Sequence, residues 1–436
     1  NAEYMGSEES KVSKTMLSLN SLHKVSVQEV HGRGKRFRLK SVCKMGSLTA
    51  TKAPTMGLDD LLGTVTVNVE KAEYKTIRVT TKAPFSFISD TVENVGIRVD
   101  LSNGCTGWGE IAACPSENSV NIVGQASLAC ENLVRRPLMS LGSALGEIGE
   151  AWSGHELAPI RSGVEMALID AAAKTIGLPL WRLFGGASDK IMTAITVRRL
   201  KFFFIQRVSP NDASAIAWKY FQQGFKTLKI KLRNDLNSDI EVLQVIRNNH
   251  PDCSIILDGD ERYSTEEAIK LLDKLRETSV KPVMFEQPVH RDDWDGLRYI
   301  TRQAKKNYGV SIAADESCTS VLDAKTIVKE HCADVIIVKL AKNGVMGSLD
   351  IIKVAKTGGV EVMVGGMIET RLATGFAGHL AAGYGCFGFA DLGSPLFLEK
   401  DPVFGGYEVC GGSVYKLSNS RGHAGFQHWD DLIINN

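Results

Sequence analysis

The chain of 436 residues is poor in three features that would each point to a particular class of protein. It has no uninterrupted apolar run of about 18 residues, the length at which a helix can cross a bilayer. Its 51 basic and 50 acidic residues give a net charge of +1, so neither a nucleic acid nor a membrane surface is indicated as a partner. Its nine cysteines include no CxxC pair, which indicates reduced, mostly buried thiols. With these classes not indicated, the composition is that of a globular protein. Its 44% hydrophobic residues are enough to form a large core.

Acidic residues are also scarce at the N-terminus. Residues 11–52 contain ten Lys or Arg but only one acid, Glu29, among many Ser and Thr. This composition is typical of organellar transit peptides and predicts targeting to a plastid or mitochondrion. The alternative is a disordered basic extension on a cytoplasmic protein. In both cases residues 1–60 are excluded from the predicted fold.

A repeated pattern of strand and helix dominates the rest of the chain. Residues 227–232 alternate apolar and polar side chains, and similar runs end at Asp258, Glu286, Asp315 and Lys339. The steps from Lys231 along these positions are 27, 28, 29 and 24 residues, enough each time for a turn and a helix. The eight predicted strands are 192–197, 227–232, 254–259, 282–287, 310–315, 334–339, 361–366 and 388–393. They predict an α/β fold with a (β/α)8-type barrel at 189–395.

The segments on either side of this barrel have a different pattern. Alternating strands at 64–78, 94–101 and 106–110 are followed by expected helices at 119–150 and 158–177. Strands followed by helices, before any regular alternation begins, predict a separate α+β domain at 64–188. The tail, 396–436, is rich in Gly and aromatic residues and is too short for a domain. We expect it to pack on the N-terminal α+β domain and complete it.

Charged residues at the predicted strand ends indicate one shared site. The carboxyl ends of parallel barrel strands meet at one rim, so Asp258, Glu286 and Asp315 should lie together. One such carboxylate alone would be interpreted as a helix cap. Three in consecutive units, flanked by Lys231 and Lys339, instead favour a Mg²⁺ site built from hard oxygen ligands.

Two lysines on either side of a metal ion indicate proton transfer at carbon. A nearby cation and a second lysine disfavour the ammonium form, so we expect the pKa of Lys231 and Lys339 to be lowered. Metal binding of a substrate carboxylate would stabilise the enolate formed when the α-proton leaves. Bases on both faces of that carbon would make the reaction a racemisation or an epimerisation.

These residues together resemble the enolase superfamily, in its muconate-lactonising subgroup. The resemblance covers residues 64–430. It is carried by Gly107-Trp108-Gly109-Glu110, Lys229-Ile230-Lys231, Phe285-Glu286-Gln287-Pro288, Ala314-Asp315-Glu316-Ser317 and Lys339-Leu340-Ala341-Lys342. Within the subgroup the chain is similar to dipeptide epimerases of the L-Ala-D/L-Glu type, particularly those of plants. That narrower match rests on residues 365–370 and on Asp391-Leu392.

The resemblance implies a role for each site residue. The metal ligands would be Asp258, Glu286 and Asp315, and the two acid/bases Lys231 and Lys339. Lys229 would lie beside the developing enolate oxygen. In the substrate-binding set, Asp391 would hold the α-ammonium, joined by Glu369 and by Phe85 of a loop of the N-terminal domain. That domain would act as a capping domain over the barrel.

The function implied is that of a Mg²⁺-dependent isomerase that epimerises dipeptides by two-base 1,1-proton transfer. A lyase or cycloisomerase of the same subgroup, such as an o-succinylbenzoate synthase, would use the same metal and lysines. Asp391 separates the two, because an ammonium site has no purpose for a substrate without an amine. A non-catalytic relative is a third interpretation. We expect a dipeptide as ligand and a homo-oligomer as the assembly.

Three positions depart from the pattern of the family. Asp260 stands where the family usually has Asn, and Gly393 stands where dipeptide epimerases usually have a second Asp. Positions 391 and 393 of a strand would point to one side, so Gly393→Asp is expected to strengthen ammonium binding. The third departure is residues 198–207, a basic and aromatic insertion after the first barrel strand. It is either a lid or retained intron sequence, and we favour the second.

The insertion gives a prediction at the level of sequence. Deleting residues 198–207 should raise soluble yield or thermal stability, because three consecutive Phe among Arg and Lys suit neither a core strand nor a solvated loop. Thermal melting of the full and shortened chains measures this. A shortened protein that folds but has lost most of its activity would instead identify a lid.

Overall fold

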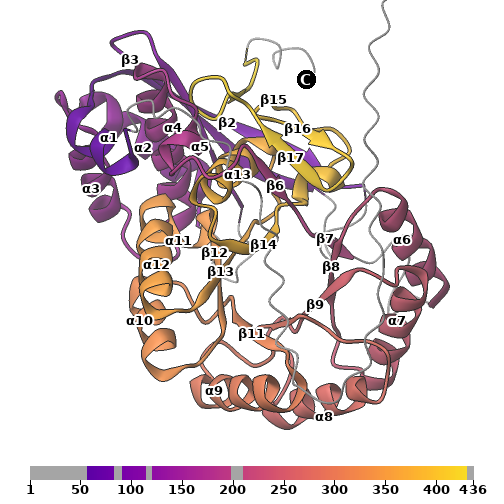
Figure 1. The fold of residues 1–436 in the computed structure, drawn as a ribbon. Coiled ribbons are helices and arrows are strands. Elements are labelled where there is room, and N and C mark those ends of the chain that lie inside the picture. Colours follow the sequence, from indigo (N-terminus) through magenta and orange to yellow (C-terminus); the bar gives the residue numbers. More distant parts are fainter. Residues whose placement is uncertain (1–55, 83–90, 114–119, 198–209, 430–436) are drawn as a thin grey trace, which may run out of the picture. The chain divides into compact units, whose positions relative to one another are not determined.

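The fold is built around a ring of parallel strands. The computed structural model describes residues 56–82, 91–113, 120–197 and 210–429 (Figure 1). Eight strands pair in sequence order as one parallel sheet. They are β7 (Ile195–Val197), β8 (Thr227–Lys231), β9 (Ser254–Asp258), β10 (Met284–Glu286), β11 (Ser311–Ala314), β12 (Val335–Lys339), β13 (Glu361–Gly365) and β14 (Phe387–Asp391). The amide of Ala194, just before β7, donates to the carbonyl of Ala390 in β14 at 2.7 Å and joins the two ends of the sheet. The predicted barrel is therefore confirmed.

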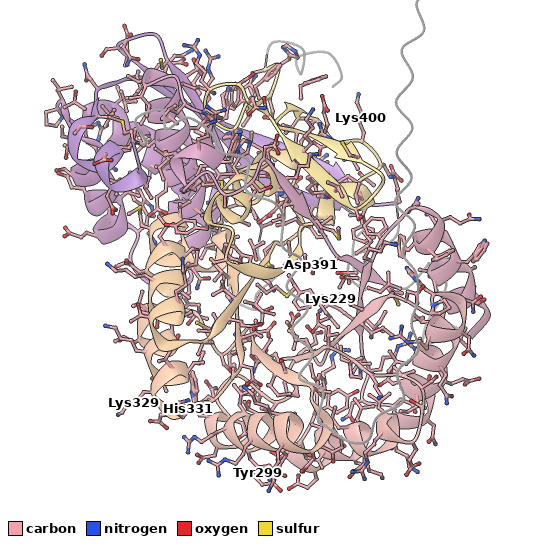
Figure 2. All side chains as sticks on the ribbon, in the orientation of Figure 1. Lys229, Tyr299, Lys329, His331, Asp391 and Lys400 are labelled. Carbon is pink, nitrogen blue, oxygen red and sulfur yellow. The ribbon has the colours of Figure 1, made fainter. Side chains whose placement is uncertain are left out.

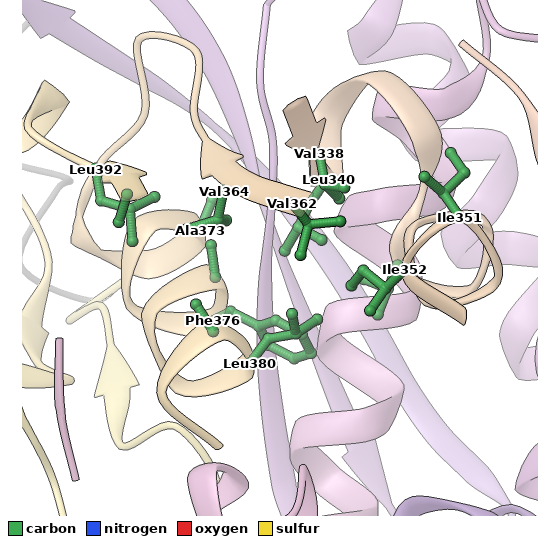
Figure 3. Packing of buried hydrophobic residues seen from close by; sticks show 14 of the residues in the cluster. Val338, Leu340, Ile351, Ile352, Val362, Val364, Ala373, Phe376, Leu380 and Leu392 are labelled. Carbon is green, nitrogen blue, oxygen red and sulfur yellow. The ribbon is translucent and has the colours of Figure 1, made fainter. Parts of the chain in front are cut away.

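Helices cover the outside of this ring and follow the strands in order. They are α6 (Pro210–Gln222), α7 (Leu236–Asn249), α8 (Thr265–Arg276), α9 (Trp294–Gln303), α10 (Val321–Glu330), α11 (Leu340–Asn343), α12 (Val345–Gly358) and α13 (Arg371–Tyr384), with a π-helical turn at Ala304–Tyr308. Among the described residues, the only helix after β14 is a short 3₁₀ helix, Ser394–Phe397. Figure 3 shows how Val362 and Val364 of β13 pack against Phe376 and Leu380 of α13.

A second hydrophobic cluster comprises side chains of the strands only. Its buried members are Ile256, Met284, Ala313, Val335, Ile337 and Met363, and Phe389 packs against it. Because side chains alternate between the two faces of a strand, this cluster fills the inside of the ring while the other residues face the helices. We call these residues the inner cluster. They lie inside the ring, directly below the carboxyl ends of the strands.

The capping domain is a three-stranded antiparallel sheet with helices. Its strands are β2 (Val69–Thr80), β3 (Thr91–Leu101) and β4 (Thr106–Ile111), and its helices are α1 (Leu58–Thr64), α2 (Ile122–Arg135), α3 (Leu141–Ala151) and α4 (Ala158–Thr175). The single helix expected at 119–150 is wrong, because the short strand β5 (Met139–Ser140) pairs with β1 (Thr66–Val67) and divides it. Helix α1 begins inside the segment excluded from the fold and buries Leu58 and Leu61.

The C-terminal residues form strands with a segment near the barrel entrance. Strands β16 (Tyr407–Cys410) and β17 (Val414–Leu417) make one sheet with β6 (Lys190–Met192), and β15 (Phe404–Gly405) pairs with β18 (Gly425–Phe426). The predicted strand 192–197 is therefore two strands. Between them Thr193 and Ala194 donate to Ser413 and Ala390, which turns the chain from one sheet to the other. The tail also contacts the capping domain, since Trp429 packs edge-on against Trp108.

The expectations drawn from composition can be compared with the described ranges. No helix in these ranges is both long and apolar enough to cross a membrane. The cysteines in these ranges are free, and four of them are buried, namely Cys130, Cys253, Cys318 and Cys332. The candidate transit peptide and the insertion at 198–207 lie outside the described residues, so both remain predictions.

Two glycines explain how strand β4 can lie directly on helix α4. A Cβ atom at Gly107 would lie 1.9 Å from the carbonyl oxygen of Ala167, and one at Gly109 would lie 2.0 Å from that of Gly163. Both distances are far below any contact distance, so the strand and helix backbones touch without side chains between them. Glu110, the next residue, is thereby brought to the barrel.

This contact predicts a large effect of a single methyl group. Gly109→Ala should lower the free energy of unfolding by about 3 kcal/mol or more, because β4 must move away from α4. Gly146→Ala is the control: Gly146 is exposed within α3 and has nothing within 4 Å of a Cβ. Gly146→Ala should raise the free energy of unfolding by roughly 0.5–1 kcal/mol. Denaturant titration measures both, and equal midpoints for the two variants would contradict the close approach.

Candidate active site

The candidate site residues stand one layer above the inner cluster. Each lies two positions beyond an inward-facing residue: Asp258 after Ile256, Glu286 after Met284, Asp315 after Ala313, Lys339 after Ile337, and Asp391 after Phe389. The pairing register aligns them, with Lys231 opposite Asp258 and Asp258 opposite Glu286. Figure 2 shows Lys229 and Asp391 within the ring of strands. The period of a strand thus gathers these side chains at one end of the barrel.

Lys229 lies deepest among the lysines. It pairs with Ile256 and therefore stands at the level of the inner cluster. Its Nζ lies 2.7 Å from Glu286 Oε1, 3.2 Å from Asp258 Oδ2 and 3.4 Å from Asp391 Oδ2. Burial by itself would lower the pKa of Lys229, but the surrounding carboxylates, Asp258 first, hold it well above its usual value. Lys229 is thus a fixed positive charge and hydrogen-bond donor.

Lys231 lies nearer the rim and contacts two carboxylates. Its Nζ is 3.2 Å from Asp258 Oδ2 and 2.8 Å from Asp260 Oδ1. Asp260 has a φ of 51°, its amide donates to Asp258, and its second oxygen accepts from Arg262 at 2.7 Å. The departure from the family's Asn therefore puts an anion directly beside a candidate base. Burial would lower the pKa of Lys231, but Asp258 outweighs it and the pKa is raised.

On the opposite side of the barrel, two lysines bind one aspartate. Lys339 Nζ donates to Asp315 Oδ2, and Lys342 Nζ donates to Asp315 Oδ1 at 2.6 Å and to the Asp315 carbonyl. Burial would lower the pKa of Lys339, yet Asp315 raises it. Among the protein's own groups, the facing carboxylates outweigh the other lysines and raise both pKa values. The lowering expected beside a bound cation stays a prediction.

Lys342 was not assigned a role from the sequence, where it appeared only as the last residue of the Lys339-Leu340-Ala341-Lys342 motif. The signal was its spacing of three from Lys339. Lys339 is the N-cap of α11, and one helical turn brings the side chain at the third position back to the same side. Lys342 is thus a second ammonium on Asp315.

The three carboxylates fit a divalent cation by their chemistry. Asp258, Glu286 and Asp315 are 3%, 1% and 1% exposed, so all three are withdrawn from water. Glu286 Oε2 is buried without a hydrogen-bond partner, and burial together with Asp258 holds the pKa of Glu286 well above its usual value. Such an oxygen needs a cation or a donor. No three acidic, His or Cys side chains of the described residues are arranged as ligands of one ion, because lysines hold these oxygens. The lysines would have to move aside for an ion to bind.

Asp391 is held where barrel strands β7 and β14 meet. Thr196 Oγ1 lies 3.2 Å from both of its carboxylate oxygens. The expectation that residues 391 and 393 share one face of a strand is wrong, because β14 ends at Asp391 and Gly393 has φ −79° and ψ −3°. A Cβ at Gly393 would lie 3.0 Å from Ile195 Cδ1 and 3.3 Å from the carbonyl oxygen of Ala194. A side chain there would meet β7.

Glu369 follows β13 and is 2% exposed. Burial and the nearby Glu110 raise its pKa to about 8. Glu110 itself accepts from Asn94 Nδ2 at 2.7 Å, from Thr370 Oγ1 at 2.6 Å, and from the amides of Thr370 and Ala373. The capping domain therefore caps helix α13 directly beside Glu369. Phe85, the remaining candidate, lies outside the described residues.

Comparisons with known proteins agree with this architecture. Residues 68–185 match the family model "Mandelate racemase / muconate lactonizing enzyme, N-terminal domain", and residues 212–423 match "Enolase C-terminal domain-like". An L-Ala-D/L-amino acid epimerase of Populus trichocarpa is 51% identical over 402 residues, covering 91% of this chain and 93% of that protein. A substrate-liganded L-Ala-D/L-Glu epimerase of Bacillus subtilis has a TM-score of 0.75 at 30% identity, covering 83% of this chain and 99% of that one. A dipeptide epimerase of Enterococcus faecalis, complexed with Mg and L-Leu-L-Tyr, has a TM-score of 0.71 at 26% identity, covering 83% and 100%.

The geometry at Gly393 adds a cost in stability to the substitution predicted from sequence. Gly393→Asp should lower the free energy of unfolding by about 1–3 kcal/mol, because its Cβ and carboxylate would press on β7. Denaturant titration measures this, and Gly393→Ala separates the contribution of the Cβ from that of the charge. Unchanged stability together with tighter binding of a free-amine dipeptide would restore the original expectation.

Proposed function

Because the chain belongs to the mandelate racemase/muconate lactonizing enzyme family, we propose that it is an isomerase that epimerises dipeptides of the L-Ala-D/L-amino acid kind with Mg²⁺. One observation carries the proposal. Lys231 ends β8 and Lys339 ends β12, four strands apart in a ring of eight, so the two ammonium groups face the site from opposite sides. A group on each face of one carbon is what inversion of configuration requires.

The relatives support the choice of substrate and metal. The poplar protein, which matches almost the whole chain, acts on L-Ala-D/L-amino acid dipeptides according to its name. Solved epimerases of Enterococcus faecalis and Cytophaga hutchinsonii hold Mg together with a dipeptide. The likeness to a muconate cycloisomerase, at 21% identity, supports the fold alone.

The candidate metal ligands are the three buried carboxylates Asp258, Glu286 and Asp315. When bound, Mg²⁺ supplies positive charge against the negative charge that develops on the substrate carboxylate as the α-proton leaves. The oxygen of Glu286 that lacks a hydrogen-bond partner supports this assignment.

The lysines divide the remaining chemistry between them. One of the two, Lys231 or Lys339, takes the α-proton from its own face in the amine form, and the other, in the ammonium form, donates a proton to the opposite face. Lys229 stands one layer deeper, at the level of Ile256, and is assigned the role of a hydrogen-bond donor. It donates a hydrogen bond to the oxygen on which charge develops.

The substrate's ammonium is assigned to Asp391, which Thr196 orients through both oxygens. Glu369 and Phe85 remain proposed contacts of the substrate. A lyase or cycloisomerase would employ the same metal and lysines but would leave this oriented carboxylate without a purpose. Targeting to an organelle and homo-oligomer formation remain predictions.

Hydrogen exchange at the α-carbon tests the proposal. In D₂O, the wild-type protein with Mg²⁺ should epimerise L-Ala-L-Glu and exchange the α-proton of both epimers. Lys339→Ala should slow epimerisation by roughly 100-fold or more while one epimer still exchanges through Lys231. Lys231→Ala should retain exchange of the other epimer only. Mass spectrometry and NMR follow both processes.

Exhaustive chelation is the matched control for the metal. EDTA should stop exchange of both epimers, and added Mg²⁺ should restore it. The proposal is wrong if both lysine variants epimerise normally, or if the chelated protein keeps full activity.

A further inference from the structure

Helix α12 is capped by a side chain from the other domain. Glu165 of α4 is 1% exposed, and its Oε2 accepts from the amides of Val345 at 2.5 Å and Met346 at 3.2 Å. These are the first residues of α12, whose own N-cap, Gly344, has no side chain to satisfy them. A carboxyl group at this position also interacts favourably with the helix dipole.

Gly344 makes this approach feasible. Its φ is +73°, and a Cβ there would lie 3.1 Å from Glu165 Oε2 and 3.3 Å from Arg161 Nε. Any larger residue would be strained and would press on the carboxyl group. The chain thus combines a glycine on the barrel with a buried acid on the capping helix.

The segment that Glu165 holds carries the candidate base Lys339. Lys339 is followed at once by α11, and Gly344 donates to the carbonyl of Leu340 at 2.8 Å, at the end of that turn. Asn343 accepts from the Lys339 amide and donates to the Cys318 carbonyl, each at 3.4 Å. Residues 339–346 are therefore one short unit fixed at its far end by Glu165. Figure 1 shows α11 and α12 next to α4, and α4 contacts both.

A cavity borders this unit on one side, although Leu340 and Val345 are buried in the core. This cavity of about 390 Å³ lies between α3, α4 and the start of α12, and its lining includes Asn343, Met346 and Gly347. The only charged residues among those lining it are Arg161 and Glu165. Arg161 is engaged elsewhere, because it donates to the carbonyls of Trp152 and Gly154. On the side of this cavity, the hydrogen bonds of Glu165 are polar contacts that hold the start of α12 to α4.

We propose that Glu165 is a positioning residue through which the capping domain sets the place of Lys339. This inference rests on the proposed two-base function. It predicts an asymmetry that arises after the strands. β8 and β12 each lie between two barrel strands, but the residues that follow Lys231 donate to barrel groups, whereas the segment that follows Lys339 donates to Glu165 of the capping domain. Loss of the Glu165 contact displaces Lys339 and leaves Lys231 in place, so only one face of the reaction is affected.

Face-selective exchange tests this. Glu165→Ala should slow α-proton exchange of one dipeptide epimer by about tenfold or more, and it should be the same epimer that Lys339→Ala affects. Exchange of the other epimer should change less than about twofold, and the effect should appear in kcat rather than KM. Glu165→Asp, which keeps the carboxyl group but is one methylene shorter, should act in the same direction and serves if the alanine variant does not fold.

Rescue by glutamine provides the second readout. Burial raises the pKa of Glu165 to about 7, against the opposing effects of the two amides and Arg161. A neutral amide whose oxygen still accepts both hydrogen bonds should therefore replace the acid, so Glu165→Gln should restore exchange of both epimers. Asp170→Asn is the matched control, because Asp170 is a buried acid of the same helix that binds Trp108, Lys174 and His423 instead. Asp170→Asn should therefore change the α-proton exchange of the two epimers to the same extent.

The outcomes separate this inference from the function on which it rests. Equal slowing of both epimers by Glu165→Ala and Glu165→Asp, or no slowing, would overturn the positioning role if Lys339→Ala remains selective. A Lys339→Ala variant that treats both epimers alike would overturn the two-base function itself, and this inference with it.

Discussion

Mutual neutralisation of buried charges at one end of the barrel is the interaction on which the rest of the structure depends. Lys229, Asp258, Glu286 and Asp315 are each less than 5% exposed. An isolated charge at that depth would be strongly destabilising, and only close opposite charges make the burial tolerable. Every one of them must therefore be placed by a rigid element. The parallel strands do this through their register, and the inner cluster fixes the register from below.

The same principle joins the domains. Glu110, Glu165 and Asp170 of the capping domain are each 1% exposed or less, and each binds backbone amides outside the capping domain. Glu110 caps α13 and Glu165 caps α12, while Asp170 accepts from the amide of His423 in the tail. The domains are thus held by acids at helix ends and in the tail, and not by hydrophobic contact alone. Each cap on the barrel also lies beside a candidate site residue, Glu369 or Lys339.

Local periodicity explains what could be predicted from the sequence. The barrel followed from charged residues that each end an apolar run, because one alternating pattern specifies both the strand and the direction of its last side chain. Asp391 followed from the family resemblance, and the structure holds it through Thr196. These features depend on residues close together in the chain.

The features that were missed depend on contacts between distant residues. The strand expected at 192–197 is divided because β6 pairs with β17 of the tail, whereas β7 pairs with β8 and the residue before β7, Ala194, donates to Ala390 of β14. Gly393 was expected to point to the same side of a strand as Asp391, but β14 ends at Asp391. The only sign of Lys342 in the sequence was its spacing of three residues from Lys339. Glu165 was one acidic residue in a largely apolar helix. No local pattern shows that its partner amides lie 180 residues away.

The bond between Asp170 and His423 has a consequence for synthesis of the chain on the ribosome. These residues are 253 positions apart, so helix α4 emerges long before the amide that its carboxylate needs. Until then Asp170 has only Lys174 and the Trp108 amide as partners. This hydrogen bond of the N-terminal domain, although that domain is made first, can thus form only after residue 423 has been released. A nascent chain halted within the barrel would leave that acid incompletely satisfied, and truncation near residue 420 would leave an N-terminal defect.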